Sequence, residues 1–160
     1  MDTEGTLAPE TPAAAREEYE TLVPAAKVAV REAAKAMEFD REEYSDRVTG
    51  EVIETVRDAL FASLLRVHVG TSDEYESWLD DNPEYESDMA GSENVDNVVW
   101  HAVPFAGVVV AATWQAEREA ALGTLRRRAF GLVYRQHLDG EGDGADADDG
   151  PDDTRDTDEA

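Results

Sequence analysis

The sequence predicts an α+β fold, in which a small, mostly antiparallel sheet of about three strands is covered on one face by about four to five helices. Three observations support this prediction. Apolar residues recur at three- and four-residue steps near both ends of residues 12–138. Shorter stretches between them are rich in β-branched residues or alternate apolar with polar side chains, as strands do. Helix-start signals precede the helical segments.

Two helices are expected ahead of residue 40. Thr11-Pro12 offers an N-cap residue followed by proline at the first helical position, which is a common helix start. Apolar residues then recur on one side of the helix as far as Met37. Pro24 has no amide hydrogen and disfavours helical geometry at the residue before it. The sequence therefore predicts a short helix and then a second one from about Pro24 to Glu38.

The next helix has the clearest start signal in the chain. Asp40 can cap it, and Glu43 lies three residues further on, as a capping box requires. Apolar residues continue at four-residue steps to Leu64. Gly50 interrupts this stretch and costs about 1 kcal/mol relative to alanine inside a helix, so we expect a kink or a close helix crossing there.

Three strands are expected in the second half of the chain. The first alternates at period two, and the other two are apolar stretches joined through Pro104 and Gly107. They cover residues 66–69, 98–103 and 108–113.

Two further helices accompany these strands. Thr71 and Glu74 form a second capping box ahead of a short helix. Residues 71–97 contain ten acids and no lysine or arginine, so most of this region is expected to be solvated surface. The last helix is expected from Gln115 to about His137.

The charge of the chain divides it into three segments. Asp and Glu number 38 against 14 Lys and Arg, for a formal net charge of -24. Residues 1–11 carry -3 and are expected to form a flexible N-terminal arm. Residues 139–160 carry -10 and contain no large apolar residue, so we expect a disordered acidic tail. The remaining -11 lies on residues 12–138, which we expect to fold as a single globular domain.

The scarcity of lysine among the basic residues indicates the kind of solvent to which the protein is adapted. Only Lys27 and Lys35 are lysines, and the other basic residues are arginines. Adaptation to heat would enrich lysine together with glutamate. At ~1 M salt the Debye length falls to about 3 Å, so the self-repulsion of an acidic domain is screened while its hydrated carboxylates keep it soluble. The sequence therefore predicts a halophilic protein.

Several classes of protein are disfavoured by what the sequence lacks. The absence of cysteine excludes disulfides, thiolate metal sites and a cysteine nucleophile. Residues 1–5 have neither the basic nor the apolar region of a signal peptide. Residues 98–114 contain His101 as their only ionisable group, but they are at the short limit for a membrane span and Pro104 interrupts them. We expect no membrane segment, no cofactor and no metal, and no catalytic motif is present.

Four residues are candidates for a pocket or an interface, namely Trp100, His101, Arg126 and His68. His68 and His101 could lie on neighbouring strands, where nearby carboxylates make a metal site conceivable, but no local histidine pair supports one. Trp100 and His101 are adjacent in a strand and point to opposite faces, so only one of them is expected to face the core.

Arg126-Arg127-Arg128 is the only run of basic residues in the chain. It could contact nucleic-acid phosphates, although high salt weakens such contacts. Three consecutive residues also spread around a helix, where neighbouring acids can pair with them. An intramolecular or subunit-interface role is therefore favoured over nucleic-acid binding.

Four stretches together resemble a small protein family of haloarchaea for which no activity is known. The resemblance covers most of residues 15–138 and implies a halophilic archaeal, cytoplasmic protein, but it implies no catalytic residues. The stretches are Ala36-Met37-Glu38-Phe39-Asp40, Ala59-Leu60-Phe61-Ala62-Ser63-Leu64-Leu65, Val95-Asp96-Asn97-Val98-Val99-Trp100-His101-Ala102 and Glu119-Ala120-Ala121-Leu122-Gly123-Thr124-Leu125-Arg126.

The expected function is that of a non-enzymatic interaction or scaffold domain that forms a homodimer. This expectation rests on the missing catalytic motifs, the abundant aromatic residues and an arginine-bearing helix in an acidic chain. One alternative is a small enzyme or ligand-binding domain with a pocket near Trp100 and His101. Another is a nucleic-acid-associated protein that uses the helix of Arg126–Arg128.

Removing residues 139–160 tests where the salt adaptation lies. Because residues 12–138 are acidic in their own right, we expect the truncated chain to need nearly as much salt for folding as the full chain does. Thermal unfolding of both chains across a salt series measures this. A truncated chain that is stable in dilute buffer would assign the salt requirement to the tail.

Overall fold

The structure, a computed structural model, describes residues 1–92 and 94–138. The strands are β1 (Asp2–Glu4), β2 (Val67–Thr71), β3 (Glu86–Ala90), β4 (Asn97–Val103) and β5 (Val108–Trp114). The helices are α1 (Pro12–Thr21), α2 (Val23–Ala36), α3 (Arg41–Arg47), α4 (Gly50–Ser63), α5 (Ser72–Asp81), α6 (Arg118–Ala129) and α7 (Arg135–Leu138). A 3-10 turn, η1 (Pro104–Ala106), joins β4 to β5, and a π-helical segment, η2 (Phe130–Tyr134), joins α6 to α7.

The expected α+β class is confirmed, but the sheet is larger than predicted and it is mixed. Its strand order is β1-β2-β4-β5-β3. The pairs β1–β2, β2–β4 and β4–β5 are antiparallel, whereas the edge strand β3 runs parallel to β5. The prediction of about three strands therefore missed β1 and β3, and with β3 it missed the parallel pair.

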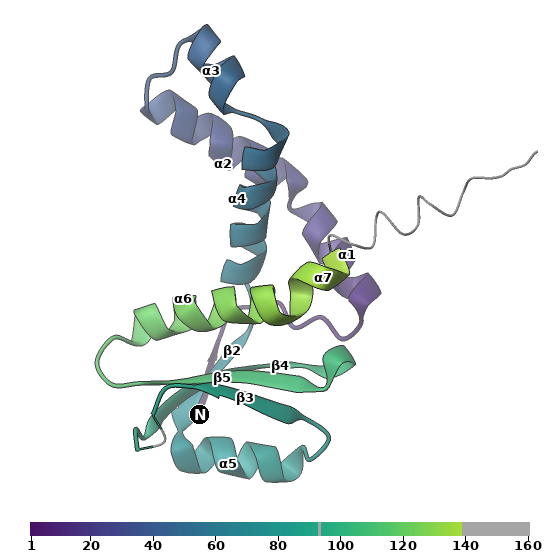
Figure 1. The fold of residues 1–160 in the computed structure, drawn as a ribbon, viewed down its shortest axis with the longest axis vertical. Helices are drawn as coiled ribbons and strands as arrows, with labels where there is room; N and C mark the ends of the chain where they lie inside the picture. Colours follow the sequence, from purple (N-terminus) through teal and green to yellow (C-terminus); the bar gives the residue numbers. More distant parts are fainter. Residues whose placement is uncertain (93, 139–160) are drawn as a thin grey trace, which may run out of the picture.

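Helices cover both faces of this sheet, so the prediction of one covered face is wrong. Figure 1 shows α6 along one face and α5 along the other. Val99, His101 and Val103 of β4 point toward α6, while Val98 and Trp100 point toward α5, and all five are buried. The expectation that only one of Trp100 and His101 faces a core was wrong for the same reason.

Strand β1 lies within the segment that the sequence assigned to a flexible arm. Its backbone pairs with β2, and the Leu7 amide donates to the Leu64 carbonyl over 2.8 Å. Gly5 makes the turn that follows at a φ of 95°, and a Cβ there would lie 2.3 Å from the Leu65 carbonyl oxygen. Strand β1 is a polar tripeptide that is held by hydrogen bonds to residues far along the chain. Its sequence therefore has no apolar alternation from which a strand could be predicted.

Strand β3 was missed because its residues are acidic and polar. Its side chains alternate between the two covered faces of the sheet. Ser87 and Met89 line a hollow beside α5, while the Asp88 carboxylate pairs with Arg128 of α6. The side chains alternate as they do in any strand, but they do not alternate between apolar and polar residues, which is the pattern that predicts a strand from sequence.

The first helices begin where their capping residues predict. The Ala14 amide donates to the Thr11 hydroxyl at the start of α1, and α2 begins beside Pro24. Both halves of the Asp40–Glu43 capping box are present at α3. A second N-cap, Thr49, then starts α4 at Gly50, so this glycine opens a helix and does not kink one.

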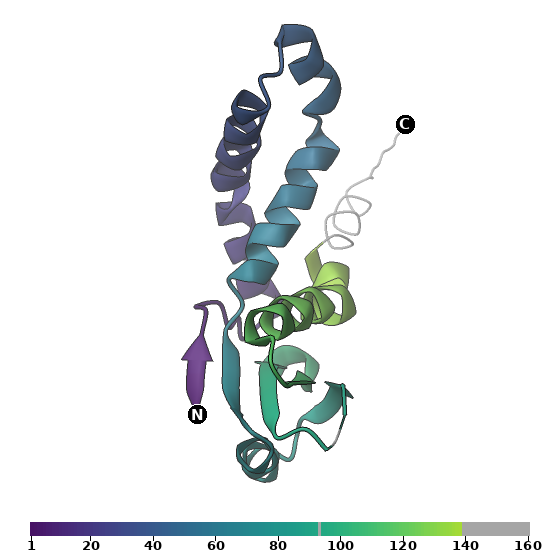
Figure 2. The ribbon, with the colours of Figure 1, turned by 90° about the vertical axis from the view of Figure 1, so that its left-hand side faces the viewer.

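The helices α2, α3 and α4 form an arm that projects away from the sheet. Figures 1 and 2 show α2 running outward and α4 returning beside it, with α3 at the far end. The base of the arm packs against α1 and α6. The remainder of the arm has α2 and α4 packed mainly against each other.

Phe61 joins the base of the arm to the core below it. Its side chain is fully buried, and its ring meets those of Tyr19 of α1, Phe130 and Tyr134 of η2 edge-on, with centroids 5.2–5.9 Å apart. Three rings from two other helical segments, α1 and η2, therefore pack around one side chain of α4.

Replacing Phe61 tests this role. Phe61→Ala leaves a cavity among three rings and should lower the free energy of unfolding by about 3–5 kcal/mol. Tyr44→Ala, an exposed aromatic on α3, should lower it by less than about 1 kcal/mol. Denaturant unfolding followed by tryptophan fluorescence measures both. A Phe61→Ala loss no larger than the Tyr44→Ala loss would contradict the central role of this ring.

Candidate functional site

His101 lies in the core between β4 and η2, where both of its ring nitrogens are hydrogen-bonded. Its exposed fraction is 1%. The Nδ1 atom lies 2.6 Å from the Arg66 carbonyl oxygen, and Nε2 lies 2.7 Å from the Tyr134 hydroxyl. A carbonyl oxygen only accepts, so Nδ1 carries the hydrogen and Nε2 accepts from the tyrosine.

The surroundings of this pair keep both groups neutral. Burial lowers the pKa of His101 to about 4, despite the opposing effect of the bond to the Arg66 carbonyl. Burial also raises the pKa of the Tyr134 hydroxyl. A histidine with both nitrogens occupied and no solvent contact is a structural hydrogen-bonding group. Sequence reasoning missed Tyr134, whose only signal was its place in the last helical segment.

Arg126 ties α6 to the neighbouring backbone. Its Nε donates to the Leu65 carbonyl over 3.0 Å, and its Nη2 donates to the Glu4 carbonyl over 3.3 Å. Arg118 forms an ion pair with the Glu4 carboxylate, and Arg128 pairs with Asp88. Arginines of α6 thus fasten both edge strands of the sheet.

His68 and Trp100 lie together on the opposite face of the sheet, which α5 covers. Their rings are 5.5 Å apart, and Tyr75 of α5 packs on Trp100 at 5.1 Å. Burial and the nearby Arg66 lower the pKa of His68. The four sequence candidates are therefore divided by the sheet, with His68 and Trp100 on one side and His101 and Arg126 on the other.

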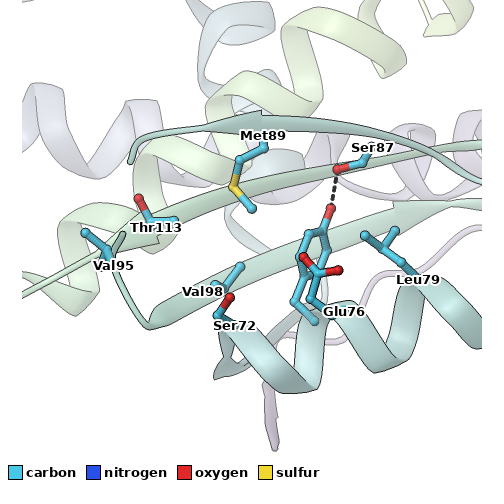
Figure 3. Close-up of a pocket in the computed structure, with 9 residues that line it drawn as sticks. Ser72, Glu76, Leu79, Ser87, Met89, Val95, Val98 and Thr113 are labelled. Carbon is cyan, nitrogen blue, oxygen red and sulfur yellow. Dashed lines mark hydrogen bonds between the residues drawn. The ribbon is translucent and has the colours of Figure 1, made fainter. Parts of the chain in front are cut away.

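A pocket of about 380 Å³ opens beside this aromatic group, between α5 and the strands β3 to β5. Figure 3 shows Ser72, Glu76 and Leu79 reaching it from α5, and Ser87 and Met89 from β3. Tyr75 also lines the pocket, and its hydroxyl is hydrogen-bonded to the Ser87 hydroxyl over 2.5 Å. Val95, Val98 and Thr113 complete the lining, which includes none of the four candidates.

Burial raises the pKa of the Tyr75 hydroxyl, which therefore stays protonated near neutral pH. No histidine lines this pocket. The arrangement is suited to binding, since it combines hydroxyl groups and one carboxylate with an apolar wall. Tyr75 and Ser87 were not found from the sequence, because only the fold brings α5 and β3 together.

A second hollow, which we call the arm groove, lies between α2 and α4. Its volume is about 380 Å³. Every lining side chain is apolar except Arg47, whose guanidinium lies over the Phe39 ring. The lining residues are Ala29, Val30, Ala33, Ala34, Met37, Phe39, Arg47, Val48, Val52 and Val56.

Two further searches cover only residues 1–92 and 94–138. Within them, no group of three or more histidine and carboxylate side chains could hold a metal ion. In the same residues, no helix has the length and apolar character that crossing a membrane requires.

The chain was compared with known proteins. A family of unknown function (DUF5809) matches residues 6–135, which is most of the described chain. No curated protein and no solved structure matches it.

The burial of His101 makes folding depend on pH. Its folded pKa of about 4 lies below the unfolded value of ~6.5, so the unfolded state binds more protons between these values. The contribution of His101 to stability is complete above pH ~6.5 and is lost as the pH falls toward 4. Between pH 7 and pH 5 this loss should be about 2 kcal/mol.

His101→Gln removes the titrating group and retains polar atoms. Its free energy of unfolding should therefore fall by about 2 kcal/mol less between pH 7 and pH 5 than that of the original chain. Denaturant titrations at both pH values measure the difference. Equal losses in the two proteins would show that His101 is not held neutral by the fold.

Proposed function

The chain belongs to the DUF5809 family, whose function is unknown, and we propose that it is a non-enzymatic interaction protein that forms a homodimer through its helical arm. The observation that carries the proposal is the arm groove. We also propose that the protein works in the cytoplasm of a halophilic archaeon. Its charge of -24 and its two lysines support the halophilic character, and the resemblance of four stretches to a haloarchaeal family supports the archaeal, cytoplasmic source.

The apolar surface of the protein gathers on the arm. Of the seven large hydrophobic side chains exposed in the described residues, five lie on or beside α2, α3 and α4, namely Val28, Met37, Tyr44, Val52 and Leu64. Met37 is 63% exposed and Val52 is 38% exposed, and both line the arm groove. Exposed apolar residues that lie next to one another, unlike scattered ones, mark interaction sites.

A second copy of the chain fits this surface for two reasons. Among the described residues, the arm groove is lined by no carboxylate and Arg47 is its one charged side chain, so two acidic chains can approach there without placing carboxylates in contact. The same surface also carries protruding side chains, Met37 and Val52, beside a hollow lined by small residues, Ala29 and Ala33. A two-fold axis brings each protrusion to the hollow of the other copy.

The result is a four-helix arrangement, in which each pair α2–α4 buries its apolar side against the other. Two antiparallel helices alone offer little apolar burial, and most helical stability in proteins comes from packing of an amphipathic face. A second pair of helices supplies that packing.

The alternative of nucleic-acid binding has less support. Arg126 and Arg128 are engaged with Leu65, Glu4 and Asp88 of the same chain. Phosphate contacts by these two side chains would have to replace those bonds.

Sedimentation of the full chain in molar salt tests the dimer. We expect a dimer for the original chain and a monomer for Val52→Glu, because the dimer would then have to bury a carboxylate of each copy in the apolar lining of the arm groove. Val28→Glu is the matched control, since Val28 is exposed on α2 but does not line the arm groove.

The Val28→Glu variant should remain dimeric, and circular dichroism should show both variants folded. A monomeric original chain would overturn the proposal. If Val52→Glu remained dimeric, the dimer contact would lie outside the arm groove. The same conclusion would follow if Val52→Glu and Val28→Glu dissociated the dimer equally.

A further inference from the structure

We propose that the pocket between α5 and β3, at the end of the molecule opposite the arm, binds a small organic ammonium ion. The pocket is distinct from the arm groove in position and in chemistry (Figures 1 and 3). Its volume of about 380 Å³ lies at the lower end of the range of ligand pockets, which fits a small molecule.

The charge of the residues that line the pocket determines whether it favours a cationic or an anionic ligand. Among the lining residues that the structure describes, Glu76 is the only Asp, Glu, Lys, Arg or His. The surrounding segment, residues 71–97, contains ten acids and no lysine or arginine. An anionic ligand would meet a carboxylate with no cation beside it, whereas an ammonium ion gains a charge-assisted hydrogen bond.

Glu76 is free to make that bond. Its neighbours are already engaged, since Glu74 binds the Thr71 amide and the N-terminal ammonium group, and Asp88 pairs with Arg128. Within residues 1–92 and 94–138, Glu76 has no hydrogen bond or ion pair. A carboxylate that lines a pocket and has no internal partner can accept a hydrogen bond from a ligand.

The helix start in the pocket wall does not offer an anion site. Ser72 is the first residue of α5, where free amides would favour an anion. The Ser72 amide, however, donates to the Asp96 carbonyl over 2.7 Å. The Glu74 amide donates to the Thr71 hydroxyl over 3.1 Å. The Asp96 carbonyl and the Thr71 hydroxyl therefore satisfy these two donors from within the chain.

The remaining lining divides into acceptors and an apolar wall. The hydroxyl oxygens of Ser72 and of the Tyr75–Ser87 pair can accept hydrogen bonds from an ammonium group. Leu79, Met89 and Val98 offer apolar surface to the carbon part of the same molecule. The class of ligand is thus a primary amine with a short apolar body.

Methyl NMR of selectively labelled methionine tests this on the full chain. The chain has three methionines, of which Met89 lines the pocket and Met37 lines the arm groove. Titration with n-butylammonium chloride, in the salt that keeps the protein folded, should shift the Met89 signal and leave the Met37 signal in place. The neutral 1-butanol should bind at least tenfold more weakly, and butyrate should not bind.

Glu76→Gln should weaken n-butylammonium binding about tenfold, because it removes the charge and retains the side-chain length. Asp80→Asn is the matched control, since Asp80 is an exposed acid of α5 that does not line the pocket, and it should leave binding unchanged.

Three results would overturn the assignment. The Met89 signal could stay fixed at millimolar n-butylammonium, butanol or butyrate could produce the same shift at the same concentration, or the two acid substitutions could have equal effects. Equal effects would indicate a general attraction of cations to an acidic surface. None of these results bears on the dimer, which the sedimentation of Val52→Glu decides separately.

Discussion

The central hairpin of β4 and β5 is buried on both of its faces, and the rest of the structure is arranged around this burial. Val99, His101 and Val103 point to α6, while Val98 and Trp100 point to α5. A strand that is apolar on both sides needs cover on both sides. The chain supplies the first cover with its last helices and the second with the short helix α5. The pocket lies where α5 meets the edge strand β3.

The arginines of α6 explain how the two polar edge strands are held in the sheet. Arg118 and Arg126 hold β1 through the side chain and the backbone of Glu4, and Arg128 holds β3 through Asp88. Each edge strand is short and acidic, so it gains little from apolar burial. Partly buried ion pairs to one helix provide the contact instead. The basic character of this helix therefore has a structural cause within the fold.

The two proposed surfaces differ because the acids are unevenly placed. The pocket lies in residues 71–97, where every charge is negative, and so it favours a cation. The described lining of the arm groove lacks carboxylates, which is why we propose it as the contact with another copy of an acidic chain. The buried pair of His101 and Tyr134 belongs to neither surface. It satisfies polar atoms inside the core, which would otherwise weaken the packing of β4 against η2.

Local signals in the sequence determined the α+β class, the helix starts at Thr11, Asp40 and Thr71, and the strands that became β2, β4 and β5. Such signals are readable because a cap or an apolar alternation acts within a few residues. The expected acidic tail lies outside the described residues. Only the tertiary structure decided that β1 and β3 join the sheet, that both faces are covered and that Tyr75 meets Ser87. Those features depend on contacts between residues far apart in the chain, which no local pattern encodes.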